Sequence, residues 1–297
     1  MTQMTPRLSR VASQRLELSV AEWGPIDGAP VVFVHGGRDQ KRSWDWVVRR
    51  LANDRRLITY DLRGHGDSDR TNDGGYSVMD HVYDLASIIE HFGLSKFDLI
   101  GHSLGGNIAL RFAGIFPDKI RTLTAMEGLG PSPRMLEERN SIPLDERLRE
   151  WIEERRKIST RAPRRMQSLD EAKQRMRARF DQLTDAQIDH LSATGIRDVE
   201  DGSVRWAYDP AAIGRTPTDL SVQDWECLWN NIDCPVWLVY GADSWASDPS
   251  KDGRAAHFKN AEVTVFEKAG HWLHHDQFDS FMSELVPFLD TAQLQKN

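Results

Sequence analysis

The first 130 residues alternate short apolar runs with amphipathic stretches. Apolar-rich runs at 31–34, 56–60, 97–100 and 120–126 predict buried strands. Between two of these runs, residues 79–92 place apolar side chains at helical spacing, and Gly93 follows as the expected C-cap. Strands that alternate with helices predict a mostly parallel α/β sheet covered by helices on both faces. In such sheets, functional sites lie at the carboxyl ends of the strands.

The pattern changes at Gly130-Pro131-Ser132-Pro133. Residues 131–230 are strongly charged and mostly helical in period, and no buried parallel strand is expected there. Strand signals return at 235–240 and 263–266, and a final helix is expected at 277–289. We therefore predict a core domain in two parts, 1–130 and 231–297, with residues 131–230 inserted between them as a helical lid.

The composition indicates which kinds of partner and which cellular location to expect. The 297 residues are 39% hydrophobic and 28% charged, with no apolar run long enough to span a membrane. Residues 1–10 lack the apolar region of a secretory signal, so a cytoplasmic location is expected, where a disulfide between Cys227 and Cys234 is not favoured. A net charge of −7 gives no reason to expect nucleic acid or membrane as a partner. A homodimer through an exposed lid helix stays open.

Residues 101–105, Gly-His-Ser-Leu-Gly, fit the pattern G-x-S-x-G. A strand is expected before them and a helix after them, which is the context of a nucleophile elbow. Ser103 is therefore the candidate nucleophile, at a helix N-terminus whose N–H groups face any developing negative charge. The alternative is an ordinary serine in a glycine-rich turn.

A nucleophilic serine needs a base and a group that orients the base. His271 follows the strand expected at 263–266 by a short loop and is the candidate base; otherwise it is a loop histidine at the start of the last helix. The backbone N–H groups of Gly37 and Leu104 are the natural pair for an oxyanion hole. His35 and His102 are expected to be structural, and no metal or organic cofactor is expected.

Four segments carry a resemblance to a known family: the turn at 35–37, the loop at 61–69, the elbow at 101–106, and Gly270-His271. With these residues the chain resembles the α/β-hydrolase superfamily. The resemblance covers the whole core but not the lid. It implies the α/β-hydrolase fold and a catalytic triad in the chain order serine, acid, histidine.

The acid departs from the usual pattern of that family. Relatives commonly place an aspartate in G-x-x-D after the strand that follows the lid, where this chain has Ser244, with Asp243 one residue earlier. Some relatives instead carry a glutamate after the strand that follows the nucleophile helix, where this chain has Glu127. Glu127 and Asp243 stay open as the acid, with Asp248 as a third candidate.

The residue types favour acyl chemistry. Dehalogenases and epoxide hydrolases of this superfamily use an aspartate nucleophile, whereas a serine attacks acyl carbons through an acyl-enzyme. The predicted substrate is a small-molecule carboxylic ester, thioester or lactone. Trp245 and Trp272 are expected to form an aromatic wall of the acyl pocket, or else to pack the lid on the core. A cofactor-free perhydrolase, an amide hydrolase and a small-molecule receptor with a slow triad are the alternatives.

Overall fold

An eight-stranded sheet forms the centre of the molecule in the computed structural model, which describes residues 5–72, 74–160, 164–213 and 219–294. The strand order is β1-β2-β4-β3-β5-β6-β10-β11; β2 pairs antiparallel with both β1 and β4, and the other neighbouring strands pair parallel. The predicted mostly parallel sheet is confirmed. The strands are β1 (Arg7–Ser13), β2 (Leu16–Trp23), β3 (Ala29–Val34), β4 (Arg55–Tyr60), β5 (Phe97–His102), β6 (Ile120–Met126), β10 (Val236–Gly241) and β11 (Ala261–Phe266).

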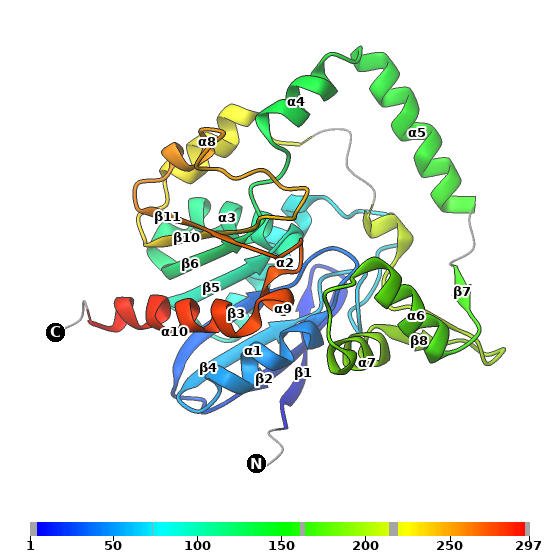
Figure 1. Cartoon of the computed structure of the whole chain (residues 1–297), viewed down its shortest axis with the longest axis horizontal. Helices are drawn as coiled ribbons and strands as arrows, with labels where there is room; N and C mark the ends of the chain where they lie inside the picture. Colours follow the sequence, from blue (N-terminus) through cyan, green and yellow to red (C-terminus); the bar gives the residue numbers. More distant parts are fainter. Residues whose placement is uncertain (1–4, 73, 161–163, 214–218, 295–297) are drawn as a thin grey trace.

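Helices cover both faces of this sheet (Figure 1). The short 3-10 helix η1 (Lys41–Trp44), α1 (Asp45–Leu51) and α10 (Phe278–Leu294) contribute to an apolar cluster on one face. The other face is covered by α2 (Val78–His91), α3 (Leu104–Ile115) and α8 (Val222–Asn230). Burial on both faces explains why the central strands read as almost continuous apolar runs.

The expected helix at 79–92 is present as α2, and its limits have local causes. Ser77 and Asp80 form a reciprocal capping box at its start. Gly93, which follows the C-cap Phe92, has φ of +61°, a conformation that glycine adopts without strain. The apolar stripe of the helix lies in the core cluster.

Residues between β6 and β10 form a charged, mostly helical segment. Its first helices, α4 (Pro133–Asn140) and α5 (Leu144–Thr160), bury no residue and form an arm at the periphery (Figure 1). Then come α6 (Leu169–Arg179), α7 (Asp185–Thr194) and three strands that the sequence did not predict. These strands, β7 (Arg165–Met166), β8 (Ile196–Asp198) and β9 (Val204–Trp206), pair antiparallel in the order β7-β9-β8. Strands of two or three residues are too short to show an alternating pattern.

The limits predicted for the lid, 131–230, include α8, which packs against α3 beside the central sheet. The lid role and the domain limits stay predictions. Among the residues described, no helix combines the length and apolar character that a membrane span requires. Cys227 is exposed, Cys234 is buried, and both are free thiols.

Candidate active site

Ser103 occupies a sharp turn between β5 and α3. Its backbone has φ of +53° and ψ of −115°, a conformation that side-chain-bearing residues rarely adopt. The neighbouring glycines make the turn sterically feasible. A Cβ on Gly105 would lie 2.1 Å from the carbonyl oxygen of Val34, and one on Gly101 would lie 2.3 Å from the carbonyl oxygen of Gly105. The turn therefore presents the serine hydroxyl at the carboxyl edge of the sheet.

His271 lies in the loop between β11 and α9 (Leu273–Asp276), with its imidazole between Ser103 and Glu127. The hydroxyl Oγ of Ser103 lies 2.9 Å from His271 Nε2. On the other side, His271 Nδ1 contacts Oε2 of Glu127 in a short hydrogen bond. We assign the N–H to Nδ1, which donates to the carboxylate, so that Nε2 accepts from the serine hydroxyl.

Glu127 directly follows β6 and has φ of +49°. Its carboxylate is completely buried and accepts two more hydrogen bonds from the end of β10 and the loop after it. The backbone N–H of Gly241 donates to Oε1 over 3.0 Å, and Ser244 Oγ donates to Oε2 over 2.6 Å. These donors stabilise the charged form of the buried carboxylate and hold it in one orientation.

The two competing carboxylates lie elsewhere. Asp243 is exposed on the cavity wall, and its backbone N–H bonds to the carbonyl of Ala269. Asp248 accepts from the backbone N–H and the hydroxyl of Ser250, within its own loop. Among the described contacts, neither side chain has a hydrogen bond with His271. The geometry thus brings Glu127, and not Asp243 or Asp248, to the base.

Gly37 and Leu104, the predicted oxyanion-hole residues, lie side by side at the same cavity as Ser103 and His271. Gly37 follows β3 and is exposed; a Cβ placed on it would have only Leu104 Cδ2 within 4 Å, at 3.9 Å. Leu104 is the first residue of α3, so its N–H has no partner inside the helix. Both residues therefore lie at the cavity beside Ser103, and the space around Gly37 is open on the cavity side.

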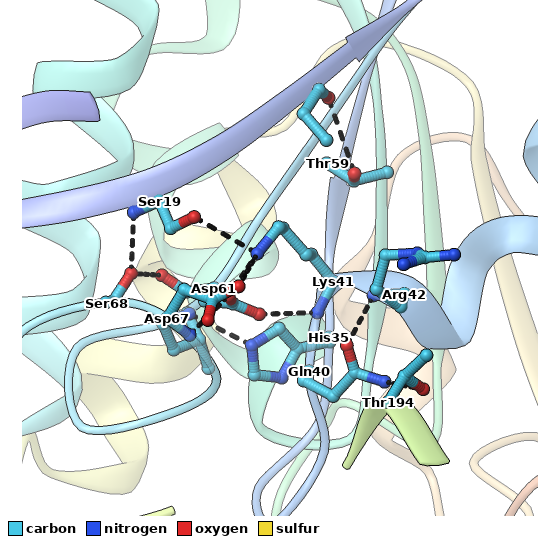
Figure 2. A network of polar contacts seen from close by, with 12 residues as sticks. Ser19, His35, Gln40, Lys41, Arg42, Thr59, Asp61, Asp67, Ser68 and Thr194 are labelled. Atoms are coloured by element: carbon cyan, nitrogen blue, oxygen red, sulfur yellow. Dashed lines mark hydrogen bonds and ion pairs between the residues drawn. The ribbon is translucent and has the colours of Figure 1, made fainter. Parts of the chain in front are cut away.

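An ion-pair network around the buried side chains of Lys41 and Asp61 lies just after the loop that contains Gly37 (Figure 2). Lys41 Nζ lies 2.5 Å from Asp61 Oδ2 and 2.9 Å from Asp67 Oδ2, and the backbone N–H of Lys41 donates to Asp61 Oδ1 over 2.7 Å. His35 Nε2 accepts from the N–H of Leu62 over 2.9 Å. Sequence reasoning missed Lys41, because a lysine is normally expected at the surface.

His102 stabilises the loop that contains His271, the candidate base. Its Nε2 donates to the carbonyl oxygen of His271 over 2.7 Å. Burial lowers the pKa of His102 well below its usual value, and the nearby His271 lowers it further, so the ring stays neutral with its proton on Nε2. His102 thus orients the His271 main chain without taking part in proton exchange.

The two predicted pocket tryptophans have different surroundings. Trp245 is 57% exposed, lines the cavity, and has its ring centroid 5.3 Å from that of His271. Trp272 also lines the cavity but is mostly buried, and its ring stacks on Phe180 with centroids 4.2 Å apart. The indole of Trp245 therefore forms part of the exposed cavity wall. Trp272 instead packs the core against Phe180, the residue that follows α6.

These side chains open on a cavity of about 1820 Å³ between the sheet edge and the segment of α4 to α8. Ser103, Glu127 and His271 lie on its core side, while residues of α4, α5 and α6 line the opposite side. The described residues contain no cluster of three or more histidine, cysteine or acidic side chains suited to a metal ion.

Comparisons with known proteins agree with this geometry. The family profile described as alpha/beta hydrolase fold matches residues 29–278. A "Serine hydrolase-like protein" of Danio rerio is 29% identical over 192 residues, covering 63% of this chain and 57% of that protein. "Esterase Rv0045c" of Mycobacterium tuberculosis is 28% identical over 308 residues, covering 96% of this chain and 90% of that protein. A thioesterase domain from the curacin biosynthetic pathway has a TM-score of 0.81 at 21% identity, covering 95% of this chain and 99% of the domain, which shows the shared fold.

The chain belongs to the alpha/beta hydrolase fold family, and it is an enzyme of that class. The resemblance inferred from the turn at 35–37, the elbow and Gly270-His271 is confirmed. The finer assignments, which are the roles of the individual residues and the bond that is cleaved, are proposals for the next subsection.

Proposed function

We propose that this enzyme hydrolyses a small-molecule carboxylic ester, thioester or lactone through an acyl-enzyme on Ser103. The observation that carries the proposal is the chain of hydrogen bonds from Glu127 through His271 to Ser103. A hydroxyl in contact with an imidazole that is itself oriented by a carboxylate is the arrangement that activates serine for attack on an acyl carbon. Esterases among the relatives support the same class of reaction.

In the first half of the reaction, Ser103 Oγ attacks the acyl carbon while its proton passes to Nε2 of His271. The carbonyl oxygen gains negative charge, and the N–H groups of Gly37 and Leu104 donate to it. Collapse of this intermediate breaks the bond to the leaving group, which takes the proton from His271. The products are the acyl-enzyme and a free alcohol or thiol; from a lactone, the alcohol stays attached to the acyl group as a hydroxyacyl-enzyme.

In the second half, water attacks the acyl carbon and gives a proton to Nε2 of His271. The second oxyanion collapses, the proton returns to Ser103 Oγ, and the carboxylic acid leaves. Glu127 keeps its hydrogen bond with Nδ1 of His271 throughout: it fixes the tautomer of the ring and stabilises the imidazolium that forms twice in each turnover. Trp245, exposed beside the base, would contact the acyl group.

The direct test is hydrolysis of p-nitrophenyl esters with chains from acetate to decanoate by the purified protein, with Ser103→Ala measured alongside. We expect multiple turnovers by the parent enzyme, with a loss of at least about 10³-fold in the variant. A fluorophosphonate probe should label Ser103 in the parent, and mass spectrometry identifies the modified peptide. Ester turnover that survives Ser103→Ala would contradict the proposal, and a peroxide-dependent halogenation assay separates perhydrolase activity from hydrolysis.

A further inference from the structure

Six arginines from separate elements line the cavity that contains Ser103 and His271. They come from the loop after β3, from α4, α5 and α6, and from the residue before β7. No lysine lines the cavity among the residues described. The six are Arg38, Arg139, Arg147, Arg164, Arg175 and Arg179.

The arginines on α4 and α5 differ according to the side on which they lie. Away from the cavity, Arg134 pairs with Glu138 over 2.8 Å and Arg149 pairs with Asp145 over 3.4 Å. The cavity-lining members of the same helices, Arg139 and Arg147, have no acidic partner among the described residues, and both are only half exposed. Arg134 and Arg149 are thus paired within their own helices, whereas Arg139 and Arg147, at the cavity, are not.

Arg147 shows this most clearly. Among the described residues, the one side-chain contact of its guanidinium is a weak hydrogen bond to the side-chain oxygen of Asn140, over 3.4 Å. Its Nε is buried and has no hydrogen-bond partner in the part of the chain described. A buried donor without a partner costs free energy unless a ligand satisfies it.

No carboxylate of the cavity forms an ion pair with Arg139 or Arg147 in the part of the chain that is described. Glu127 bonds to His271, Asp219 binds Arg111 through both oxygens, and burial raises the pKa of Asp39 to about 7. Asp276 accepts from the N–H of Gly270, which leaves Asp181 and Asp243, both exposed. Of the cavity arginines, Arg175 pairs with Glu171 over 2.5 Å, whereas Arg139 and Arg147 keep guanidinium groups that no described carboxylate neutralises by direct contact.

We propose that the substrate carries a carboxylate or phosphate group remote from its acyl bond, and that Arg139 and Arg147 bind this group. The planar guanidinium matches both anions through paired hydrogen bonds. The cavity, at about 1820 Å³, has room for a substrate that extends from Ser103 to the arm formed by α4 and α5. This inference rests on the proposed function, because it assigns the substrate class of that site.

The test compares kcat/KM within two matched pairs of substrates. Mono-p-nitrophenyl suberate and its methyl ester differ by one carboxylate on the acyl side. Octanoyl-4′-phosphopantetheine and octanoyl-pantetheine differ by one phosphate on the leaving group. We expect kcat/KM for the anionic member of one pair to exceed that for the neutral member by roughly 100-fold, mainly through a lower KM. This ratio should fall as the salt concentration is raised to about 0.5 M. The pair that shows the preference identifies the source of the anion.

The variants are Arg139→Gln and Arg147→Gln, with Arg134→Gln and Arg149→Gln as controls on the outer side of the same helices. Each cavity-side variant should lower the anionic-to-neutral ratio roughly tenfold, while the outer-side variants should leave it unchanged. A ratio near one for both pairs in the parent enzyme, or equal effects of inner and outer variants, overturns the inference while leaving the proposed function in place.

If no ester or thioester is cleaved, the proposed function fails, and the inference is decided by binding. Calorimetry with suberate and with 4′-phosphopantetheine on the parent protein then replaces kinetics. Binding that is lost in the Arg139→Gln, Arg147→Gln double variant supports the anion site. Absence of binding by both compounds overturns it.

Discussion

Ser244 donates a hydrogen bond of 2.6 Å to the same oxygen of Glu127 that contacts His271. Ser244 occupies the position at which the family commonly has an aspartate, whereas the carboxylate that contacts His271 here comes from the residue after β6. The carboxylate thus approaches the base from a different strand, and the residue at the usual position has become its hydrogen-bond donor. This relationship determines which substitutions should stop the enzyme.

Glu127→Gln should lower kcat by about 10³–10⁴-fold, because the amide cannot stabilise the imidazolium and favours the wrong tautomer of His271. Asp243→Asn is the matched control: it removes a carboxylate from the same cavity, and we expect less than about a threefold change, since that side chain is exposed. Steady-state kinetics on one ester suffices. Equal losses in the two variants would contradict the assignment of the acid.

The position of the acid should be transferable between the two strands. Glu127→Gly alone should be nearly inactive, and adding Ser244→Asp should recover activity by roughly tenfold or more, because residue 244 already reaches the oxygen that contacts His271. Glycine suits position 127, where φ is +49°. Ser244→Asp in the parent background is the control, and we expect it to slow the enzyme, since two carboxylates would then share one site. Recovery no greater than that of Glu127→Gly with Ser244→Ala would refute the transfer.

Lys41→Met should destabilise the fold by about 3–5 kcal/mol, because it leaves the buried carboxylate of Asp61 without its cation. Adding Asp61→Asn should restore part of this loss, since the amide oxygen still accepts the backbone N–H of Lys41. Urea unfolding measures both variants. If the double variant is less stable than Lys41→Met, the charge of Asp61 does not account for the loss.

Stability should fall as the pH drops below about 6.5. Burial lowers the pKa of His275 to about 3 and that of His274 well below its usual value. The unfolded chain takes up protons near pH 6.5 while the folded protein does not, so the free energy of unfolding decreases by up to about 1.4 kcal/mol per pH unit for each such histidine. Above that pH both states are neutral, and these groups contribute no slope.

Urea unfolding between roughly pH 7 and pH 4 tests this slope. His274→Phe should reduce the slope by about one proton, because Phe takes up no proton in the unfolded chain. The Phe ring can occupy the stacked position against Trp44, so the fold should tolerate the substitution. His91→Gln is the control, since His91 is exposed at the end of α2. An unchanged slope in His274→Phe would show that this ring is not the neutral group assumed here.

Local sequence patterns were sufficient for much of the core. The apolar runs of β3 to β6, the helical spacing of α2 and the small residues around Ser103 each report a steric or burial requirement that acts over a few neighbouring residues. The strands β7, β8 and β9 were missed because each has only two or three residues, which leaves no periodicity to recognise. The pairing of Met166 in β7 with Val204 in β9 also joins segments that lie far apart in the sequence.

The sequence by itself determined the elbow, the nucleophile candidate, the base candidate and the family, because each depends on residues close together in the chain. It left Glu127 and Asp243 open, since both follow strands whose carboxyl ends lie near the base. Only the tertiary structure decided which of them reaches His271: the pairing of β6 with β10 brings Glu127 under Gly241 and Ser244, while Asp243 remains exposed. In the loop after β10, Ser244 contacts the Glu127 carboxylate while its neighbour Asp243 is exposed. Which of two adjacent loop residues faces inward depends on how the strands pack, and the sequence alone does not show it.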